Sequence, residues 1–383
     1  MKIVYIIESL VLKGGTERII SEKANYLSEK YGYEIYIISC TQKYNQPNAF
    51  PLLESINQIN LGIPYYSQYR FKYPKRLWVK HVTNKELRCS ISNVIHQISP
   101  DIIIGIGHFK ANLVCTLKCQ AIKIIECHEA RSFTLLETGK RKSLFWRLYI
   151  NIYRRKYFST IEKKADAVIT LTKGDKNEWR KAKYTKVIPN FSMMQISHIS
   201  NCEQKRIISV GRLEWEKGYE RLLDVWEKVS VRYPEWKLDI FGEGNQYEKL
   251  QKKIKNKGIR NICIHNATEN ISQEYANSSI CVITSLYEGF ALVLLEALRH
   301  GVPCIAYDCP FGPGSIIEDN KCGFLIKNGN ITDYIMKVSQ LIENESLRKD
   351  FSQKAIIRAD CFSVDSIMKE WKDLFEQLLY KRI

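Results

Sequence analysis

The chain has 383 residues, a length that fits two domains better than one, and 45% of its residues are hydrophobic, which is enough for buried cores. The formal net charge of +17 predicts an anionic partner, which could be nucleic acid, an anionic membrane surface or anionic small molecules. Twelve cysteines without a CxxC pair argue against a zinc ribbon or a thioredoxin-like site and favour a reduced, cytosolic compartment.

The N-terminal segment predicts a strand followed by a helix that opens on glycines. Lys2 to Ile7 is a short apolar run followed by an acid, so we expect neither a signal peptide nor a membrane span here. Gly14 and Gly15 precede a helix predicted to run to about Lys30, and backbone N–H groups at such a glycine pair can approach an anion. A plain turn is the alternative. Glu34 to Cys40 is predicted to be the second strand.

The next segment speaks against a dinucleotide site. Residues 41–75 are polar and aromatic with little periodicity, and we assign no element to them. A helix is predicted over Glu86 to Ile98, and a strand over Pro100 to His108 that ends in a glycine turn. The fingerprint G-x-G-x-x-G fails after this strand because Lys110 takes the place of its third glycine. An oxidoreductase that uses a dinucleotide therefore loses its main support.

A histidine follows the next predicted strand. Ile122 to Glu126 is apolar enough to be buried, and His128 comes directly after its carboxyl end. Ligands of parallel sheets bind at the carboxyl ends of the strands, so His128 is a candidate for a ligand cleft. The alternative is a histidine in a surface loop. His108 is a weaker candidate of the same kind.

The strongest local charge feature runs from Lys140 to Lys164, where basic residues alternate with Phe, Trp and Tyr. A basic amphipathic segment with aromatic anchors is typical of a membrane interface. Arg147, Arg154, Arg155 and Lys156 are the candidate contacts with anionic lipid. The alternative is a helix that packs on its own domain and exposes a solvated basic face.

A polar segment separates two halves of the chain. Asp166 to Thr172 predicts a strand, and Lys186 to Phe191 closes the first domain. Ser192 to Gln204 has no apolar periodicity and is interpreted as a linker.

The second half begins with a strand, a charged loop and a helix, predicted over Arg206 to Val210, Gly211 to Gly218 and Tyr219 to Val231. Arg212 and Lys217 lie five residues apart in this loop and together suit a diphosphate. Isolated charges in a loop are more often solvated, and that alternative stays open.

A strand–turn–helix unit then carries two acids. Ile280 to Thr284 is predicted to be a buried strand, and Phe290 to His300 the helix that follows the turn. Glu288 lies in the turn, and Glu296 lies among leucines on the helix. Ionised carboxylates at these positions can accept hydrogen bonds from the diol of a sugar. The alternative is a charge at the helix N-terminus and a solvent-facing acid. Three further helices are predicted over Ile331 to Ile342, Glu345 to Arg358 and Ser363 to Tyr380.

Residues 288–306 resemble the signature of glycosyltransferase family 4, a family of retaining enzymes that includes many bacterial surface-polysaccharide enzymes. The loop with Arg212 and Lys217 and the Pro–Asn turn at Asn190 resemble the same family. The resemblance implies an α/β fold of the GT-B type, with two Rossmann-like domains facing each other across a cleft. It implies an acceptor domain over 1–192, a nucleotide-sugar domain over 203–360 and a helix over 361–383 that crosses back.

The resemblance also implies roles for particular residues. Arg212 and Lys217 hold the donor diphosphate, Glu288 contacts hydroxyls of the donor sugar, Glu296 contacts the ribose, and His128 lies beside the sugar. The implied catalytic residues are His128, Arg212, Lys217 and Glu288. The implied substrate-binding residues are Gly14, Gly15, Asn190, Gly211, Gly242, Glu243, Gly289, Phe290, Ala291, Leu292 and Glu296. Many relatives have an acid at the position of Ser315, and this chain does not, so Ser315 receives no catalytic role.

The activity implied is the transfer of a hexose or N-acetylhexosamine from a nucleotide sugar, first of all a UDP-sugar, without a metal ion or other cofactor. The acceptor implied is a lipid-linked or growing glycan of bacterial O-antigen, capsule or lipopolysaccharide. We expect a cytoplasmic protein, peripheral at the inner face of the cytoplasmic membrane, that binds no nucleic acid. The alternatives are a basic nucleic-acid-binding protein, which lacks a recognisable binding module, and a nucleotide-dependent oxidoreductase.

Overall fold

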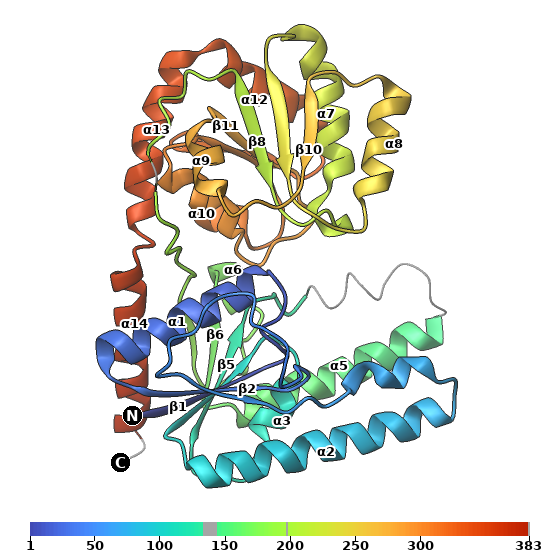
Figure 1. Ribbon diagram of the computed structural model, residues 1–383, viewed down its shortest axis with the longest axis vertical. Coiled ribbons are helices and arrows are strands. Elements are labelled where there is room, and N and C mark those ends of the chain that lie inside the picture. The colour runs from blue at the N-terminus through green and yellow to red at the C-terminus, as the bar shows by residue number, and fades with distance from the viewer. Residues whose placement is uncertain (133–143, 197, 382–383) are drawn as a thin grey trace. The chain divides into compact units, whose positions relative to one another are not determined.

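The computed structural model describes residues 1–132, 144–196 and 198–381. The chain divides into two units (Figure 1): unit 1 is Met1–Ile188 with Ile367–Ile383, and unit 2 is Pro189–Ser366. Each unit is a parallel β-sheet with helices packed against it, so the predicted α/β class with two Rossmann-like domains is confirmed. The chain passes from one unit to the other twice, once after Ile188 and once after Ser366.

The described part of unit 1 contains a seven-stranded parallel sheet in the order β3-β2-β1-β4-β5-β6-β7. Its central strands are isoleucine-rich and buried, as expected for strands that are covered on both faces. The strands are β1 Lys2–Ile7, β2 Glu34–Ser39, β3 Asn57–Asn60, β4 Ile102–Ile106, β5 Ile122–Cys127, β6 Ala167–Thr170 and β7 Thr185–Val187.

Two stretches of unit 1 differ from the sequence-based expectation. The helix predicted over Glu86 to Ile98 is longer than expected and begins at Lys75. Its first turns were not recognised in the sequence, because Leu77 and Trp78 are exposed there and break the usual helical periodicity of buried apolar residues. Residues 41–75, left without an element, contain β3 and a 3₁₀ helix. The helices of unit 1 are α1 Gly15–Tyr31, η1 Tyr65–Arg70, α2 Lys75–Ile98, α3 Ala111–Cys115, α5 Leu144–Lys164, α6 Lys173–Lys176 and most of α14 Val364–Tyr380.

Unit 2, as far as it is described, has a six-stranded parallel sheet in the order β10-β9-β8-β11-β12-β13. This order reverses direction between β8 and β11, which is the topological switch point where ligands of such sheets bind. The strands are β8 Arg206–Val210, β9 Lys237–Phe241, β10 Ile262–His265, β11 Ile280–Ile283, β12 Cys304–Asp308 and β13 Gly323–Lys327. The helices are η2 Trp215–Lys217, α7 Tyr219–Arg232, α8 Tyr247–Lys257, α9 Ile271–Ala276, α10 Leu292–Arg299, α11 Pro313–Ile316, α12 Ile331–Glu343 and α13 Glu345–Asp360.

Across the described ranges, none of the helices combines the length and the apolarity that crossing a bilayer requires. The last helix, α14, packs on unit 1. Trp371 on α14 is buried, and Glu370 forms an ion pair with Lys186 of β7 at 3.3 Å.

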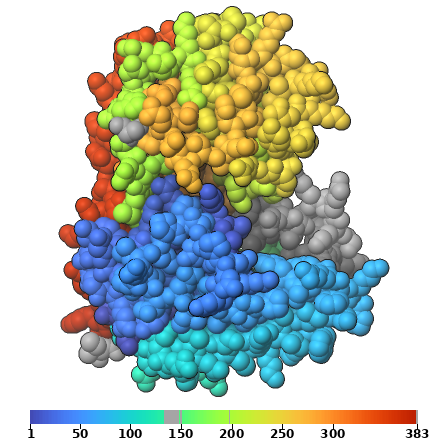
Figure 2. Space-filling model, viewed as in Figure 1, coloured from blue at the N-terminus to red at the C-terminus, as the bar shows by residue number. Residues whose placement is uncertain are grey.

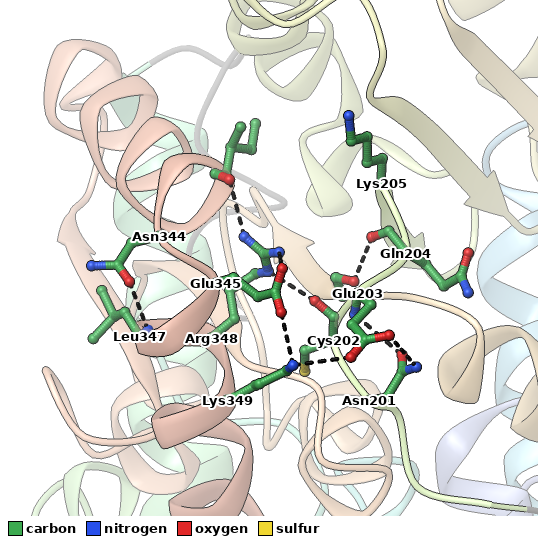
Figure 3. A network of polar contacts seen from close by, with 12 residues as sticks. Asn201, Cys202, Glu203, Gln204, Lys205, Asn344, Glu345, Leu347, Arg348 and Lys349 are labelled. Carbon is green, nitrogen blue, oxygen red and sulfur yellow. Dashed lines mark hydrogen bonds and ion pairs between the residues drawn. The ribbon is translucent and has the colours of Figure 1, made fainter.

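A buried arginine closes the start of unit 2 against its last helices (Figure 3). The Arg348 guanidinium on α13 donates to the backbone oxygens of Cys202, Leu341 and Ile342 at 2.7–3.0 Å and lies 5.2 Å from the centre of the Trp236 ring. Burial lowers the pKa of Arg348, but three carbonyl partners keep its donors satisfied. Lys349, the next residue, is half exposed and pairs with two surface acids.

We therefore expect Arg348→Met to destabilise unit 2 by about 2–4 kcal/mol, because three buried carbonyl oxygens lose a charged donor. The matched control, Lys349→Met, should change the stability far less, because its ion pairs are solvated. Urea unfolding followed by tryptophan fluorescence measures both. Equal losses in the two variants would contradict a structural role for the buried guanidinium.

Candidate active site

Most candidate residues of unit 2, though neither Asn190 nor Glu296, lie in the loops that follow the carboxyl ends of β8, β9 and β11. The loop after β8 is held against the end of β11 by Gly218, whose φ of 65° is in the left-handed region. A Cβ on Gly218 would lie 2.3 Å from the backbone oxygen of Thr284, and the Thr284 hydroxyl donates to the Gly218 carbonyl at 3.0 Å. This close approach places Lys217 directly over the turn that follows β11.

Lys217 and Glu288 form a partly buried ion pair at the switch point. The Lys217 Nζ donates to Glu288 Oε1 at 2.8 Å and to Oε2 at 3.0 Å, and the Ser285 hydroxyl donates to Oε1 at 2.6 Å. Glu288 is only 6% exposed. A carboxylate with such partners is held in one orientation. The loop after β12 also touches it, because a Cβ on Gly312 would lie 2.5 Å from the Glu288 Cβ.

Arg212 lies on the outside of the same loop. Its side chain is 64% exposed and pairs with Glu216 at 3.1 Å. The two basic residues of the loop are therefore in different environments: Lys217 is already neutralised by a buried acid, whereas the Arg212 guanidinium lies in solvent, where an anionic ligand can bind it.

Glycines let the loops after β8 and β9 meet backbone to backbone. A Cβ on Gly242 would lie 1.9 Å from the Gly211 oxygen, so no larger residue fits there. The Leu213 N–H donates to the Glu243 carbonyl at 2.7 Å, while the Glu243 side chain is exposed. Gly211, Gly242 and Glu243 thus share one rigid corner beside Arg212.

The N-terminus of α10 faces the turn that holds Glu288. Gly289, Phe290, Ala291 and Leu292 lead into this helix, and Ala291 takes a left-handed φ of 61° that costs a non-glycine residue roughly 1–2 kcal/mol. The first N–H groups of a helix lack partners within the helix and carry partial positive charge. Backbone donors for an anion are therefore available beside the Lys217–Glu288 pair.

Glu296 lies further along α10 and is buried, with 6% exposed. The Tyr275 hydroxyl donates to its Oε2 at 3.4 Å. Burial, together with the charge of Glu296, raises the pKa of Tyr275 well above its usual value. Because both Glu288 and Glu296 are buried, the alternative of a solvent-facing acid is wrong. The two carboxylates have separate protein partners.

Asn190 is buried at the start of unit 2, but the described contacts do not bring it to the Lys217–Glu288 pair. The segment that follows it is held at the other end of α10, where the Arg299 guanidinium donates to the backbone oxygens of Ser192 and Met194.

The three remaining candidates lie in unit 1. Gly14 caps α1, and a Cβ at this position would lie 2.4 Å from Glu17 Oε2, so the first turn of the helix already holds a carboxylate. Gly15 begins the helix. His128 follows β5 and is buried, with its Nε2 3.1 Å from Glu126 Oε1.

His108, the weaker candidate, is a packed histidine. Its ring stacks on Trp179 at 6.2 Å and meets the edge of Phe158 at 5.4 Å. Burial lowers the pKa of His108 to about 4.

Sequence reasoning missed four partners of the candidate residues: Ser285, Tyr275, Glu126 and Lys23. Two of them had a usable pattern. Glu126 precedes His128 by two residues, and side chains two apart on a strand share a face. Lys23 falls in the 3–4 spacing of the buried side of α1, with Ile19, Ile20 and Leu27. Ser285 and Tyr275 are recognisable only from the fold.

Among the described residues, one group has the composition of a metal site: Asp239, Cys263 and His265, whose ligand atoms lie within 4.8 Å of one another. Asp239 already accepts from Arg206 at 2.5 Å and from His265 at 2.8 Å. A guanidinium in the shell leaves little room for a cation, and the group is separate from the switch point.

Comparison with known proteins identifies similar sequences and folds. The family described as "Glycosyl transferases group 1" matches residues 194–358. An uncharacterized glycosyltransferase of Haemophilus influenzae is 28% identical over 97% of this chain and 99% of its own length. The amylovoran biosynthesis glycosyltransferase AmsD of Erwinia amylovora is 27% identical with the same coverage, and the lipopolysaccharide 1,6-galactosyltransferase of Salmonella typhimurium is 26% identical over 90% of each chain.

A solved structure of a mutant of S. aureus TarM, in complex with Fondaparinux, alpha-GlcNAc-glycerol and UDP, aligns with a TM-score of 0.78 at 19% identity. It covers 98% of this chain and 99% of that one, and it therefore shows the fold. Residues 194–358 form a glycosyl transferases group 1 domain, and the chain is a glycosyltransferase with the GT-B fold.

Proposed function

We propose that this glycosyltransferase retains the anomeric configuration and moves a hexose or N-acetylhexosamine from a UDP-sugar to a lipid-linked or growing glycan of the bacterial surface. The observation that carries the proposal is the buried Lys217–Glu288 pair at the switch point, beside Arg212 and the N-terminus of α10. Relatives that make amylovoran and lipopolysaccharide, and a structural neighbour bound to UDP, support it.

The leaving diphosphate would bind where positive charge is available. Arg212 offers a solvated guanidinium fork, and α10 offers backbone N–H groups. Lys217 lies next to both, and its ammonium can be shared between Glu288 and a phosphate oxygen. Charge that develops on the leaving group is thus stabilised by protein groups, and we propose that the enzyme needs no metal ion.

The two buried acids would divide the donor between them. Glu288, at the turn, would accept from hydroxyls of the sugar, and Glu296, on α10, would accept from the ribose. His128 of unit 1 is proposed to act beside the donor sugar. The relatives and the domain match are glycosyltransferases, which argues against a nucleic-acid-binding protein and against an oxidoreductase.

We further propose that unit 1 binds an anionic membrane surface. The sequence predicted this role for the segment from Lys140 to Lys164. Residues 140–143 of that segment and the side chain of Arg147 lie outside what the structure describes. The Arg154 guanidinium turns inward, donating to the Arg131 carbonyl at 3.2 Å, and Phe158 is buried. Arg155 and Lys156 remain exposed. One face of α5 therefore packs on its own unit.

A second basic and aromatic surface lies on η1 and α2, residues 65–88, drawn in light blue to cyan in Figure 2. Residues 70–88 contain seven Lys and Arg and one acid. Six large apolar side chains of this surface are exposed: Tyr66, Tyr69, Tyr73, Leu77, Trp78 and Val82. Positive charge interleaved with exposed Trp and Tyr fits an anionic bilayer, so we extend the proposed membrane contact to the η1–α2 surface.

A donor screen tests the activity. The purified chain is incubated with UDP-, GDP- and ADP-sugars in turn, and released nucleotide is measured, with and without a chelator. Release with one UDP-sugar, unaffected by the chelator, is expected. Release that occurs only with another nucleotide, or that the chelator abolishes, contradicts that part of the proposal.

Arg212→Gln is expected to lower kcat/KM by about 2.7–4 kcal/mol in transition-state free energy while leaving the melting temperature unchanged, because the side chain is exposed. Lys217→Met should lower both kcat/KM and the melting temperature, since it also leaves the buried Glu288 without its counter-charge. Steady-state kinetics and thermal unfolding separate the two cases. Wild-type kinetics in either variant would contradict the diphosphate assignment.

Glu296→Gln is expected to weaken the binding of UDP itself, whereas Glu288→Gln should leave UDP affinity nearly unchanged and impair turnover of the UDP-sugar. The reason is that Glu296, on α10, is proposed to contact the ribose, whereas Glu288, at the turn, is proposed to contact the sugar. Calorimetric titration with UDP measures the first effect. An equal loss of UDP affinity in both variants would refute the division of roles.

The membrane proposal predicts that the wild type sediments with anionic but not neutral vesicles, and less so as salt rises, because each basic residue near the surface contributes roughly 1 kcal/mol. Replacing Lys72, Lys75, Lys80 and Lys85 by Gln should abolish sedimentation without changing UDP binding. The matched control replaces four exposed lysines of unit 2, Lys249, Lys252, Lys255 and Lys321. Equal behaviour of the two variants would show that only net charge matters.

A further inference from the structure

Unit 1 buries a lysine that the proposed mechanism does not use. Lys23 on α1 is buried, and its ammonium pairs with the carboxylate of Glu126 on β5, which is also buried. Lysine is almost never fully buried unless it is paired. Removing two charges from water costs several kcal/mol for each ion before their attraction offsets it. A buried ion pair of this kind is therefore not explained by a gain in stability.

The surroundings of the ammonium are aromatic. The Lys23 Nζ lies 3.9 Å from the ring centre of Trp371 on α14 and 5.4 Å from that of Tyr5 on β1. Trp371 is 2% exposed and Tyr5 is fully buried. A cation over two aromatic faces gains attraction from both in a site that excludes water. The C-terminal helix thus covers the pair and keeps the local dielectric low.

The second oxygen of the same carboxylate reaches His128. Glu126 Oε2 pairs with Lys23, and Oε1 lies 3.1 Å from His128 Nε2. Burial acts to raise the pKa of Glu126, but the Lys23 charge and the hydrogen bond from His128 outweigh it, so the pKa falls to about 2. The carboxylate is ionised at neutral pH. The charged or titratable groups that interact with it are Lys23, His128, Tyr5 and the thiol of Cys127.

An ionised carboxylate can only accept hydrogen bonds, so the facing Nε2 must carry a proton. In the neutral imidazole the other nitrogen, Nδ1, is then the acceptor. Lys23 fixes the carboxylate, the carboxylate fixes the ring, and the ring presents a defined nitrogen. Each link is a contact within unit 1.

We infer that Lys23 and Glu126 are positioning residues that hold His128 in one tautomer and one orientation for sugar transfer, with Trp371 closing the pair from water. The inference rests on the proposed function, in which His128 acts beside the donor sugar. It predicts that the buried pair matters for turnover and leaves UDP binding, which belongs to unit 2, unchanged.

The direct test is the tautomer of His128, read from the ring ¹⁵N shifts of histidine-labelled protein at alkaline pH and assigned with His128→Gln. The wild type should show Nε2–H with Nδ1 unprotonated, and Glu126→Gln should show a mixture of tautomers. A wild-type Nδ1–H tautomer, or no change in Glu126→Gln, overturns the inference. This readout needs no turnover, so it decides the network even if the donor screen fails.

The effects on activity and on stability are then separated with a double variant, Lys23→Met with Glu126→Gln, which we call the charge-free pair because it removes both charges. Glu126→Gln alone leaves a buried unpaired ammonium and should lower the melting temperature, whereas Lys23→Met with Glu126→Gln removes both charges and should recover it. Both variants should lose about 10–100-fold in kcat, as when the partner that orients a functional histidine is removed. KM and UDP affinity should stay unchanged. Recovery of kcat together with stability would show that the pair is only structural.

A matched control is the partly exposed pair Lys186–Glu370, which joins β7 to α14 within the same unit. Lys186→Met with Glu370→Gln should alter neither the tautomer nor kcat. Adding His128→Gln to the charge-free pair should lower kcat less than twofold further, because the pair acts through that ring. If His128→Gln lowered kcat by the same factor in the charge-free pair as in the wild type, the inference would be overturned, since His128 would then act independently of the pair.

Discussion

The switch point of unit 2 depends on one ion pair. Lys217 comes from the loop after β8 and Glu288 from the turn after β11, the two strands between which the sheet order reverses. Their hydrogen bonds tie both loops together, and Gly218 makes the approach possible because no side chain fits against Thr284. The pair therefore holds the loop that carries Arg212 beside the turn that leads into α10.

Both units place a lysine–glutamate pair near the carboxyl edge of the sheet, and the two pairs differ in exposure. Lys217 keeps 20% of its side chain accessible, whereas Lys23 keeps 1%. A partly open pair can exchange its partner for a ligand, while a closed one cannot. The first is suited to binding and the second to holding a neighbouring group in place, and this division follows from dielectric surroundings alone.

Much of the fold could be predicted because three signals in the sequence indicate the same elements: apolar runs for strands, helical spacing of apolar residues, and glycines where helices end. The stretch from Ile280 to Arg299 is an example. The start of α2 was missed, since Leu77 and Trp78 face solvent and no pattern of burial marks that end. For the site, residue type and spacing indicated Glu288 and Lys217 but not that they pair with each other. Ser285 and Tyr275 are partners through tertiary contact, which spacing along the chain does not encode.

The path of α14 has a consequence for how the protein is made. Unit 1 contains residues 1–188 and the segment from Ile367 onward, with all of unit 2 between them in the chain. Because Trp371 follows unit 2 in the chain, it is synthesised after the sheet of unit 1 and after every residue of unit 2. Until then Lys23 lacks the Trp371 ring that lies over its ammonium in the folded unit. Unit 2 is a continuous stretch, so all of its residues are synthesised before unit 1 receives the helix that covers its buried lysine.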